Sequence, residues 1–233
     1  MAPTSIDGTE ITGATIDGQD VSEITVDGET VFTAIPDIVD NFEDLPDGPY
    51  DTESVSDFYN GDTGSASRVT SNVISGTHSL EKTTKNTSIY STSGLPNYPQ
   101  KGDVFEAKID PVGTNADKDF GFILFGMDSS GNGYGVCGNN FVGDAIIRTF
   151  SAGNRDDTLA SATSSLSDGE QHRMVVEWQT DNTIVLNVFD TNDNLQANVS
   201  ATDSTFSNQT GVGFFSGGGG SSSTVFFDDY VIQ

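Results

Sequence analysis

The stretch His172–Phe189 reads HRMVVEWQTDNTIVLNVF, and it has the pattern of a β-hairpin. Met174, Val176 and Trp178 stand at every second position, so in an extended chain their side chains lie on one face of a strand. A second β-branched run starts at Thr183, directly after an Asp-Asn pair that favours a tight turn. The stretch therefore predicts two antiparallel strands with one apolar face.

The same two-residue period continues on the N-terminal side of this hairpin. Phe105, Ala107 and Ile109 alternate with charged residues, as in a strand that is buried on one face. Phe120–Met127 reads FGFILFGM, is apolar on both faces and is typical of a central strand. Across residues 38–233, Gly, Asn, Asp and Ser residues separate the short strands, and no apolar stripe has a helical period. The sequence predicts an all-β fold, a two-sheet antiparallel jelly-roll sandwich.

The charge of the chain limits what it can bind. The 233 residues include 35 Asp and Glu against 9 Lys and Arg, for a net charge of −26. So few cations cannot neutralise the phosphates of a nucleic acid or the anionic surface of a membrane. Fifteen Phe and six Tyr provide a core and argue against a disordered chain. We also expect no membrane insertion and no signal peptide, because the apolar runs are short and interrupted.

The acidity has a pattern of its own. Lysine is scarce, Asp outnumbers Glu, and the remaining polar residues are chiefly Gly, Ser, Thr and Asn. This composition resembles that of proteins from halophiles that accumulate salt, in which molar salt screens an acidic surface. The alternative is an acidic secreted protein from a mesophile. We take the halophilic interpretation as the hypothesis to test.

The N-terminal region is a repeat with a period of ten residues. It reads SIDGTEITGA from Ser5, TIDGQDVSEI from Thr15 and TVDGETVFTA from Thr25. Each Asp-Gly pair favours a tight turn, so the repeat predicts three successive hairpins or a meander of very short strands. Pro36 ends the last strand, which divides the chain into a hairpin module, 1–36, and a sandwich domain, 37–233.

An apolar residue recurs at every fifth position of this module. These residues are Ile6, Ile11, Ile16, Val21, Val26 and Val31. Hairpins this small cannot bury such a row internally. We therefore predict that the row is a contact surface, either between copies in a homo-oligomer or with another protein.

Four segments resemble the concanavalin A-like and laminin-G-like jelly rolls. They are NFEDLPDG (Asn41–Gly48), GTHSL (Gly76–Leu80), GEQHRMVVEW (Gly169–Trp178), and GVGFFSG with the closing TVFFDDYVIQ (Gly211–Gln233). The N-terminal repeats look like short segments in tail and baseplate-associated proteins of tailed viruses. Together with the acidic composition, the whole chain resembles a virion protein of a haloarchaeal tailed virus.

This resemblance implies a function and a location. The chain is expected to be a virion structural or attachment protein, a tail fibre, spike or capsid turret, that is assembled in a haloarchaeal cytoplasm and carried on the extracellular particle. The jelly roll is expected to contact a host surface glycan or S-layer, while residues 1–36 bind sister copies or another virion protein. The alternatives are a structural decoration protein without a ligand and a glycan-active enzyme.

The enzyme alternative is disfavoured by the positions of the carboxylates. Jelly-roll glycosidases carry two carboxylates on one strand face, in a Glu-x-Asp-x-x-Glu pattern or a close variant. Glu106 and Glu177 each lack a second carboxylate two residues away, and Asp228 and Asp229 are adjacent, so they point to opposite faces of a strand. One cysteine, Cys137, and two histidines leave little material for a catalytic triad. We expect no enzymatic activity.

A calcium site is implied by the resemblance. Jelly rolls of this kind often hold a structural Ca²⁺ between the opening and the closing segments, which lie side by side. The matching residues of this chain are Glu43, Asp44, Asp228 and Asp229. Carboxylate oxygens suit Ca²⁺, although ordinary surface acidity is the alternative in so acidic a chain.

Sugar binding needs aromatic side chains in polar surroundings. Tyr90, Tyr98 and Tyr134 lie in stretches rich in Gly, Asn and Ser, and we predict that they are the glycan-binding residues. The alternative is that each is an ordinary strand or surface tyrosine. Trp178 continues an apolar face and is predicted to belong to the core.

Overall fold

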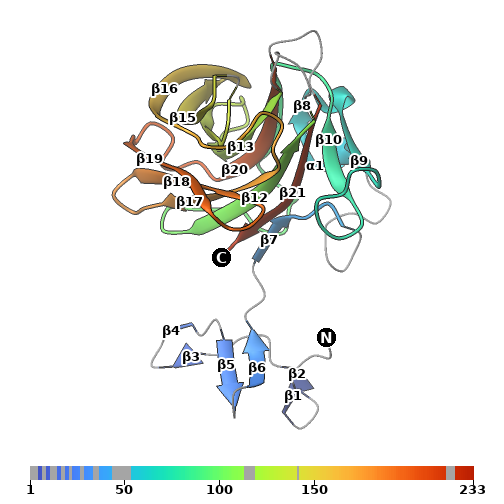
Figure 1. Ribbon diagram of the computed structural model, residues 1–233, viewed down its shortest axis with the longest axis vertical. Helices are drawn as coiled ribbons and strands as arrows, with labels where there is room; N and C mark the ends of the chain where they lie inside the picture. Colours follow the sequence, from blue (N-terminus) through green and yellow to red (C-terminus); the bar gives the residue numbers. More distant parts are fainter. Residues whose placement is uncertain are drawn as a thin grey trace. The chain divides into compact units, whose positions relative to one another are not determined.

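The computed structural model describes two compact units, Met1–Asp37 and Ile38–Gln233 (Figure 1). In the second unit and at its start it describes residues 37–43, 54–112, 119–140, 142–218 and 224–233. In the first unit it describes the backbone of six short strands. No helix among the described residues is long and apolar enough to cross a bilayer.

The described strands of the first unit form antiparallel pairs. β1 (Ser5–Ile6) pairs with β2 (Thr9–Glu10), β3 (Thr15–Ile16) with β4 (Gln19–Asp20), and β5 (Glu23–Val26) with β6 (Glu29–Thr33). In each pair the last residue of the first strand lies opposite the first residue of the second, with an Asp-Gly dipeptide between them in the sequence. This is the pairing of three successive hairpins.

The predicted contact row of the hairpin module has no described side chains. It consists of Ile6, Ile11, Ile16, Val21, Val26 and Val31, all outside the residues whose side chains the structure describes. Their role stays a prediction.

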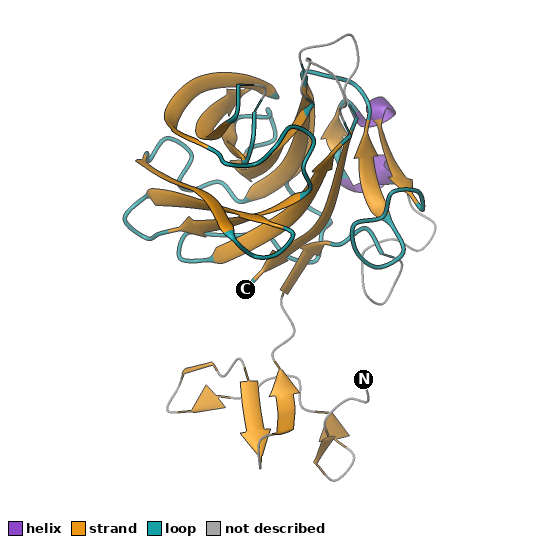
Figure 2. Cartoon of the chain, viewed as in Figure 1, coloured by secondary structure: helices purple, strands orange, loops and turns teal. Residues whose placement is uncertain are grey.

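The larger sheet of the second unit has eight strands (Figure 2). Its order is β19 (Leu195–Thr202), β18 (Thr183–Asp190), β17 (His172–Trp178), β12 (Val104–Pro111), β21 (Val225–Ile232), β10 (Ser79–Lys82) and β9 (Ala66–Val69), and β7 (Asp37–Asp40) also pairs with β21. The opening and closing strands of the unit are therefore neighbours, as the resemblance implied.

The smaller sheet has seven strands. Its order is β16 (Asn154–Thr163), β15 (Asp144–Ser151), β14 (Gly133–Cys137), β13 (Phe120–Met127), β20 (Gly211–Gly217), β11 (Thr87–Ser91) and β8 (Asn60–Gly61). The described helical segments are short: α1 (Val55–Phe58) and the 3₁₀ turn η1 (Thr63–Ser65). Every strand pair of the two sheets for which the structure gives a register is antiparallel, and the predicted all-β sandwich is confirmed.

The main core lies between the two sheets. Met174, Val176 and Trp178 of β17 point into it and are fully buried, as the two-residue period predicted. Ile123 and Phe125 of β13 enter the same core from the smaller sheet. The remaining apolar residues of β13 belong to a different cluster, on the opposite face of that sheet.

Candidate functional site

The second cluster lies on the face of the smaller sheet that points away from the main core. We call it the outer cluster, and it consists of Phe120, Phe122, Leu124, Met127, Cys137, Ile146, Phe150 and Phe215. The rings of Phe122, Phe150 and Phe215 meet edge to face, with centroids 5.3–5.7 Å apart. Each pair of this kind adds about 0.5–1.5 kcal/mol to the effect of burial.

Glycine makes room for these rings. A Cβ atom built on Gly135 of β14 would lie 2.4 Å from Phe150 Cε2 and 2.8 Å from Leu124 Cδ2. A Cβ atom on Gly217 of β20 would lie 2.3 Å from the Phe120 ring. Because these strand glycines have no side chains, the phenylalanine rings can pack directly against the backbone of the sheet.

The outer face is concave because its strands fold over toward one another. The turn between β15 and β16 contains Ala152 and Gly153, which have φ values of 49° and 74°. Ser88 Oγ of β11 donates to the carbonyl oxygen of Gly153 at 2.8 Å, although β14, β13 and β20 stand between β11 and β15 in the sheet. Gly153 N donates to the carbonyl oxygen of Gly131 at 2.8 Å. Figure 1 shows the curl of β15 and β16 over the rest of the sheet.

Arg155 lies over the outer cluster, and Arg148 lies close to Arg155. The guanidinium of Arg155 is 5.3 Å from the centroid of Phe120 and 5.4 Å from that of Phe215, and its Nη2 donates to Asn86 Oδ1 at 2.8 Å. Arg148 Nη2 donates to the backbone carbonyl oxygen of Asp156 at 2.6 Å. Burial lowers the pKa of both arginines, and the nearby charge of Arg155 lowers that of Arg148 further. Both remain charged at any physiological pH.

Tyr90 lies on the same concave face. It is half-buried and packs against the outer cluster, and its hydroxyl makes no hydrogen bond with any residue that the structure describes. A Cβ atom on Gly131 would lie 3.0 Å from Tyr90 Cε1, so this glycine lets the ring approach the β13–β14 connection. Tyr90 is the predicted glycan-binding residue that keeps both an accessible ring and an unused polar group.

The hydroxyl groups of the other two predicted glycan-binding residues, Tyr98 and Tyr134, already form hydrogen bonds within the protein. The Tyr98 hydroxyl lies 2.9 Å from Ser91 Oγ and accepts from Leu95 N at 3.1 Å, while its ring packs against the main core. Tyr134 is wholly buried between the sheets, and its hydroxyl donates to Asp203 Oδ1 at 2.7 Å. The prediction that Tyr134 is a surface platform is therefore wrong, because its side chain points inward from β14.

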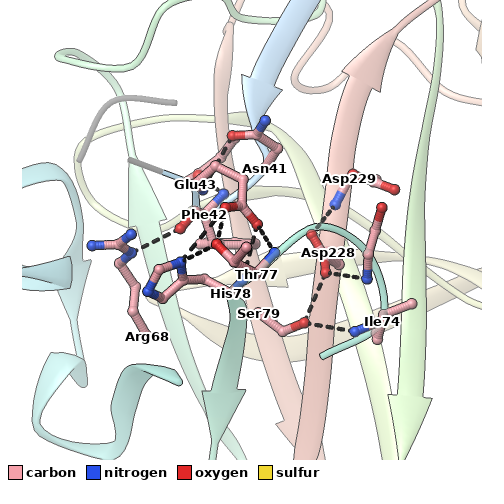
Figure 3. A network of polar contacts seen from close by, with 12 residues as sticks. Asn41, Phe42, Glu43, Arg68, Ile74, Thr77, His78, Ser79, Asp228 and Asp229 are labelled. Atoms are coloured by element: carbon pink, nitrogen blue, oxygen red, sulfur yellow. Dashed lines mark hydrogen bonds and ion pairs between the residues drawn. The ribbon is translucent and has the colours of Figure 1, made fainter. Parts of the chain in front are cut away.

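The residues of the predicted calcium site form a different network (Figure 3). Glu43 Oε1 accepts from the backbone N–H groups of Thr77 and His78 at 2.6 and 2.9 Å. Asp228 Oδ2 accepts from Ser75 N at 2.9 Å and from Ser79 Oγ at 2.7 Å. The two carboxylates thus hold the segment 74–79 from both sides.

Asp228 and Asp229 differ in burial and in their partners, as predicted for adjacent strand residues that point to opposite faces. Asp228 is fully buried, and Asp229, with a φ of 49°, forms an ion pair with Lys108 at 2.6 Å. Burial raises the pKa of Asp228 to about 7; the hydrogen bond from Ser79 opposes this shift, and the charge of Asp229 adds to it.

These carboxylates do not make a calcium shell among the described residues. The structure groups no three His, Cys, Asp or Glu residues of its described part closely enough to hold a metal ion. The oxygens of Glu43 and Asp228 already accept from protein donors, and Asp44 lies outside the described residues. Calcium binding stays a prediction.

A pocket on the larger sheet differs from the outer face of the smaller sheet in that its cations form ion pairs. It has a volume of about 280 Å³ and is lined by residues that include Lys108, Arg173, Asp190 and Asp193. Its cations are already paired, Lys108 with Asp229 and Arg173 with Asp193 and Glu106. Arg148 and Arg155, by contrast, form no ion pair with any residue in the described part of the chain. Sequence reasoning missed Arg148 and Arg155, although four arginines in the chain, two of them seven residues apart around an Ala-Gly turn, were a usable signal.

No protein-family model matches this sequence, and no curated protein does either. Among solved structures, the fold is similar to carbohydrate-binding module CBM66 from Bacillus subtilis, with a TM-score of 0.54 and 14% identity over 75% of this chain and 94% of that one. Galectin LEC-6 from Caenorhabditis elegans aligns with a TM-score of 0.40 and 11% identity, over 66% and 95% of the two chains. A glycosyl hydrolase family protein from Mycobacterium fortuitum gives 0.47 and 10%, over 83% and 97%.

These likenesses concern the fold. The jelly-roll sandwich that the sequence predicted is confirmed, and carbohydrate-binding module CBM66 has a similar fold. These likenesses give no support to a viral or haloarchaeal origin.

Proposed function

We propose that this chain is a non-catalytic glycan-binding protein whose ligand lies on the concave face of the smaller sheet, against Tyr90. The observation that carries the proposal is the state of Tyr90: its ring is half-buried on the outer cluster, and its hydroxyl has no partner among the described residues. A fixed aromatic ring with a free hydroxyl can stack on the C–H face of a sugar and bind one of its hydroxyl groups.

The fold supports the proposal by analogy. The similar Bacillus subtilis protein is a carbohydrate-binding module, and we extend that function to this chain. The absence of enzymatic activity is part of the proposal. It rests on the sequence, which lacks paired carboxylates at the two-residue spacing that retaining glycosidases of this fold use.

A finer part of the proposal is attachment to a host surface from a virus particle. It rests on the sequence alone: on the hairpin repeat of residues 1–36 and on the acidic composition. In this view the repeat joins the particle or sister copies, and the jelly roll binds the host glycan. A decoration protein without a ligand is the rival function, and the binding experiment separates the two.

The test is calorimetric titration of the full chain in molar KCl with a panel of neutral and acidic oligosaccharides. We expect saturable binding of at least one sugar, and Tyr90→Ala should weaken it about tenfold or more, as for loss of a stacking aromatic and a hydrogen bond. Tyr98→Phe is the matched control and should bind normally. Absence of binding across the panel, or equal affinity of Tyr90→Ala, would reject the proposal in favour of a ligand-free role.

A further inference from the structure

Arg148 and Arg155 differ from Arg173, which lines the pocket on the larger sheet. Arg173 forms ion pairs with Glu106 at 2.7 Å and Asp193 at 2.9 Å. Arg148 and Arg155 form no ion pair with any residue that the structure describes, although the chain carries 35 carboxylates. Burial lowers the pKa of Arg148 and the negative charges of Asp156 and Asp157 oppose this shift, but neither carboxylate forms an ion pair with it among the described residues. In a protein with a net charge of −26, two neighbouring cations that lack an ion pair among the described residues call for an explanation.

The guanidinium group of Arg148 is also incompletely satisfied. Arg148 Nε is buried and has no hydrogen-bond partner among the described residues. Its Nη2 binds the backbone carbonyl of Asp156 rather than a carboxylate. A buried donor without an acceptor costs about 1–3 kcal/mol, and more when it is charged. Repulsion between the two nearby cations adds to this cost.

The position of the pair connects it to the proposed sugar site. Arg155 stacks on Phe120 and Phe215 of the outer cluster, and Tyr90 packs against the same cluster. Arg155 is the second residue of β16, and the turn that precedes β16 is joined to β11, the strand of Tyr90, by the hydrogen bond from Ser88 to Gly153. Tyr90 and Arg155 thus contact the same cluster, and Arg148 lies close to Arg155.

We infer that Arg148 and Arg155 bind the acidic group of the glycan, an oxyanion that is either a uronate carboxylate or a sulfate ester. This inference rests on the proposed function and deepens it, because it names the class of sugar. A guanidinium fork presents parallel N–H groups that match the oxygens of a carboxylate or a sulfate. Such an oxyanion supplies an acceptor for Arg148 Nε–H and neutralises the repulsion between the cations.

The net charge of the protein sets the conditions of the measurement. At low salt, the long-range field of a chain this acidic repels an anionic sugar. At about 1 M KCl the Debye length is about 3 Å, so this field is screened while direct contacts persist. Binding is therefore best measured in molar salt.

The experiment compares trigalacturonate, a sulfated galactotriose and neutral galactotriose on the full chain. We expect at least one acidic probe to bind about tenfold or more tightly than the neutral one, as for charge-assisted hydrogen bonds. Arg148→Gln and Arg155→Gln should each remove this preference. Arg173→Gln, which deletes the same charge on the larger sheet, should keep it. The preferred probe distinguishes a uronate from a sulfate.

Failure of the inference and failure of the proposed function look different. Equal affinity for the neutral and both acidic probes overturns the acidic specificity and leaves glycan binding in place. Absence of binding to all three probes overturns the acidic specificity as well, while the oligosaccharide panel described above decides glycan binding separately. Should a variant not fold, the NMR signal of Arg148 Nε–H in the unmodified chain provides the second readout. It should shift when the acidic probe is added and stay unchanged with galactotriose, and an unmoved signal overturns the inference.

Discussion

Ser88 and Gly153 are 65 residues apart in the sequence, yet the hydroxyl of Ser88 donates to the carbonyl oxygen of Gly153 at 2.8 Å. The bond joins β11 to the β15–β16 turn across β14, β13 and β20. It holds the smaller sheet in a curl around the outer cluster. The concave face on which Tyr90, Arg148 and Arg155 lie is a consequence of this contact and of the packing beneath it.

Packing of the outer cluster should be sensitive to one methyl group. In Gly135→Ala, the new Cβ would approach Phe150 and Leu124 within 2.8 Å, inside a cluster of fixed rings. Overpacking of this kind costs about 1–3 kcal/mol, and urea unfolding should show it. Gly64→Ala is the control, since nothing lies within 4 Å of its Cβ position. Equal stability of the two variants would contradict the described packing.

The buried carboxyl of Asp228 should make stability depend on pH. Its pKa in the folded protein is raised to about 7 from 3.8, so the folded state holds the proton more tightly. The contribution of this group to stability is therefore greatest below about pH 4, decreases as pH rises to about 7, and is constant above that. Each pKa unit corresponds to about 1.4 kcal/mol.

The measurement is the free energy of unfolding between pH 5.5 and 8.5. The unmodified chain should lose stability over this range relative to Asp228→Asn, which has no proton to release. Asp181→Asn, at an exposed turn carboxylate, is the control and should follow the unmodified chain. A constant difference between Asp228→Asn and the unmodified chain would show that Asp228 does not titrate there.

Calcium should raise the melting temperature if Glu43, Asp44, Asp228 and Asp229 bind it, because a ligand of the folded state alone stabilises that state. The shift should be reversed by a chelator and lost in Asp44→Asn. Magnesium at the same concentration is the control for general screening. Identical melts with calcium and magnesium would argue against a specific site.

Salt should stabilise the whole chain. With a net charge of −26, self-repulsion grows as screening falls, and the Debye length increases from about 3 Å at 1 M to about 10 Å at 0.1 M. The melting temperature should therefore rise steeply between about 0.1 and 3 M KCl. A flat curve would contradict the halophilic interpretation of the composition.

The hairpin module should control association. Burial of one Ile or Val side chain contributes about 1.5–3 kcal/mol, so the substitutions Ile16→Asp and Val26→Asp together should dissociate a homo-oligomer of the full chain. Light scattering in molar salt measures the mass. Thr9→Asp with Gln19→Asp adds the same charge at polar positions of the repeat and should leave the mass unchanged. A monomeric unmodified chain would place the contact, if any, on another protein.

The strands and the main core follow from local patterns. The period of Met174, Val176 and Trp178 predicts a strand with one buried face, and all three are buried. FGFILFGM predicts a strand that is buried on both faces, and every residue of β13 is buried. Its outer face is covered by side chains of the outer cluster and not by a further layer of secondary structure. The antiparallel pairing of residues 23–33 follows likewise from a short-range turn signal.

Which of the predicted tyrosines belongs to the candidate site depended on the direction in which each strand points its side chains in the folded protein. Tyr90 and Tyr134 have similar polar neighbours in the sequence, but β11 directs the first to the concave face and β14 directs the second into the main core. The glycines beside Tyr134 suggested an exposed loop, whereas Gly133 and Gly135 are strand residues of β14. A polar stretch does not reveal which face of its strand is covered.

The sequence by itself thus determined the strands, their alternation and the excess of negative charge, because side-chain direction in a strand has a period of two residues that the backbone imposes. Only the tertiary structure decided that Arg155 lies over the aromatic cluster that Tyr90 also contacts, with Arg148 close by and neither arginine in an ion pair with a described residue. Their juxtaposition depends on the curl of the smaller sheet, which contacts such as that between Ser88 and Gly153 hold across strands far apart in the chain.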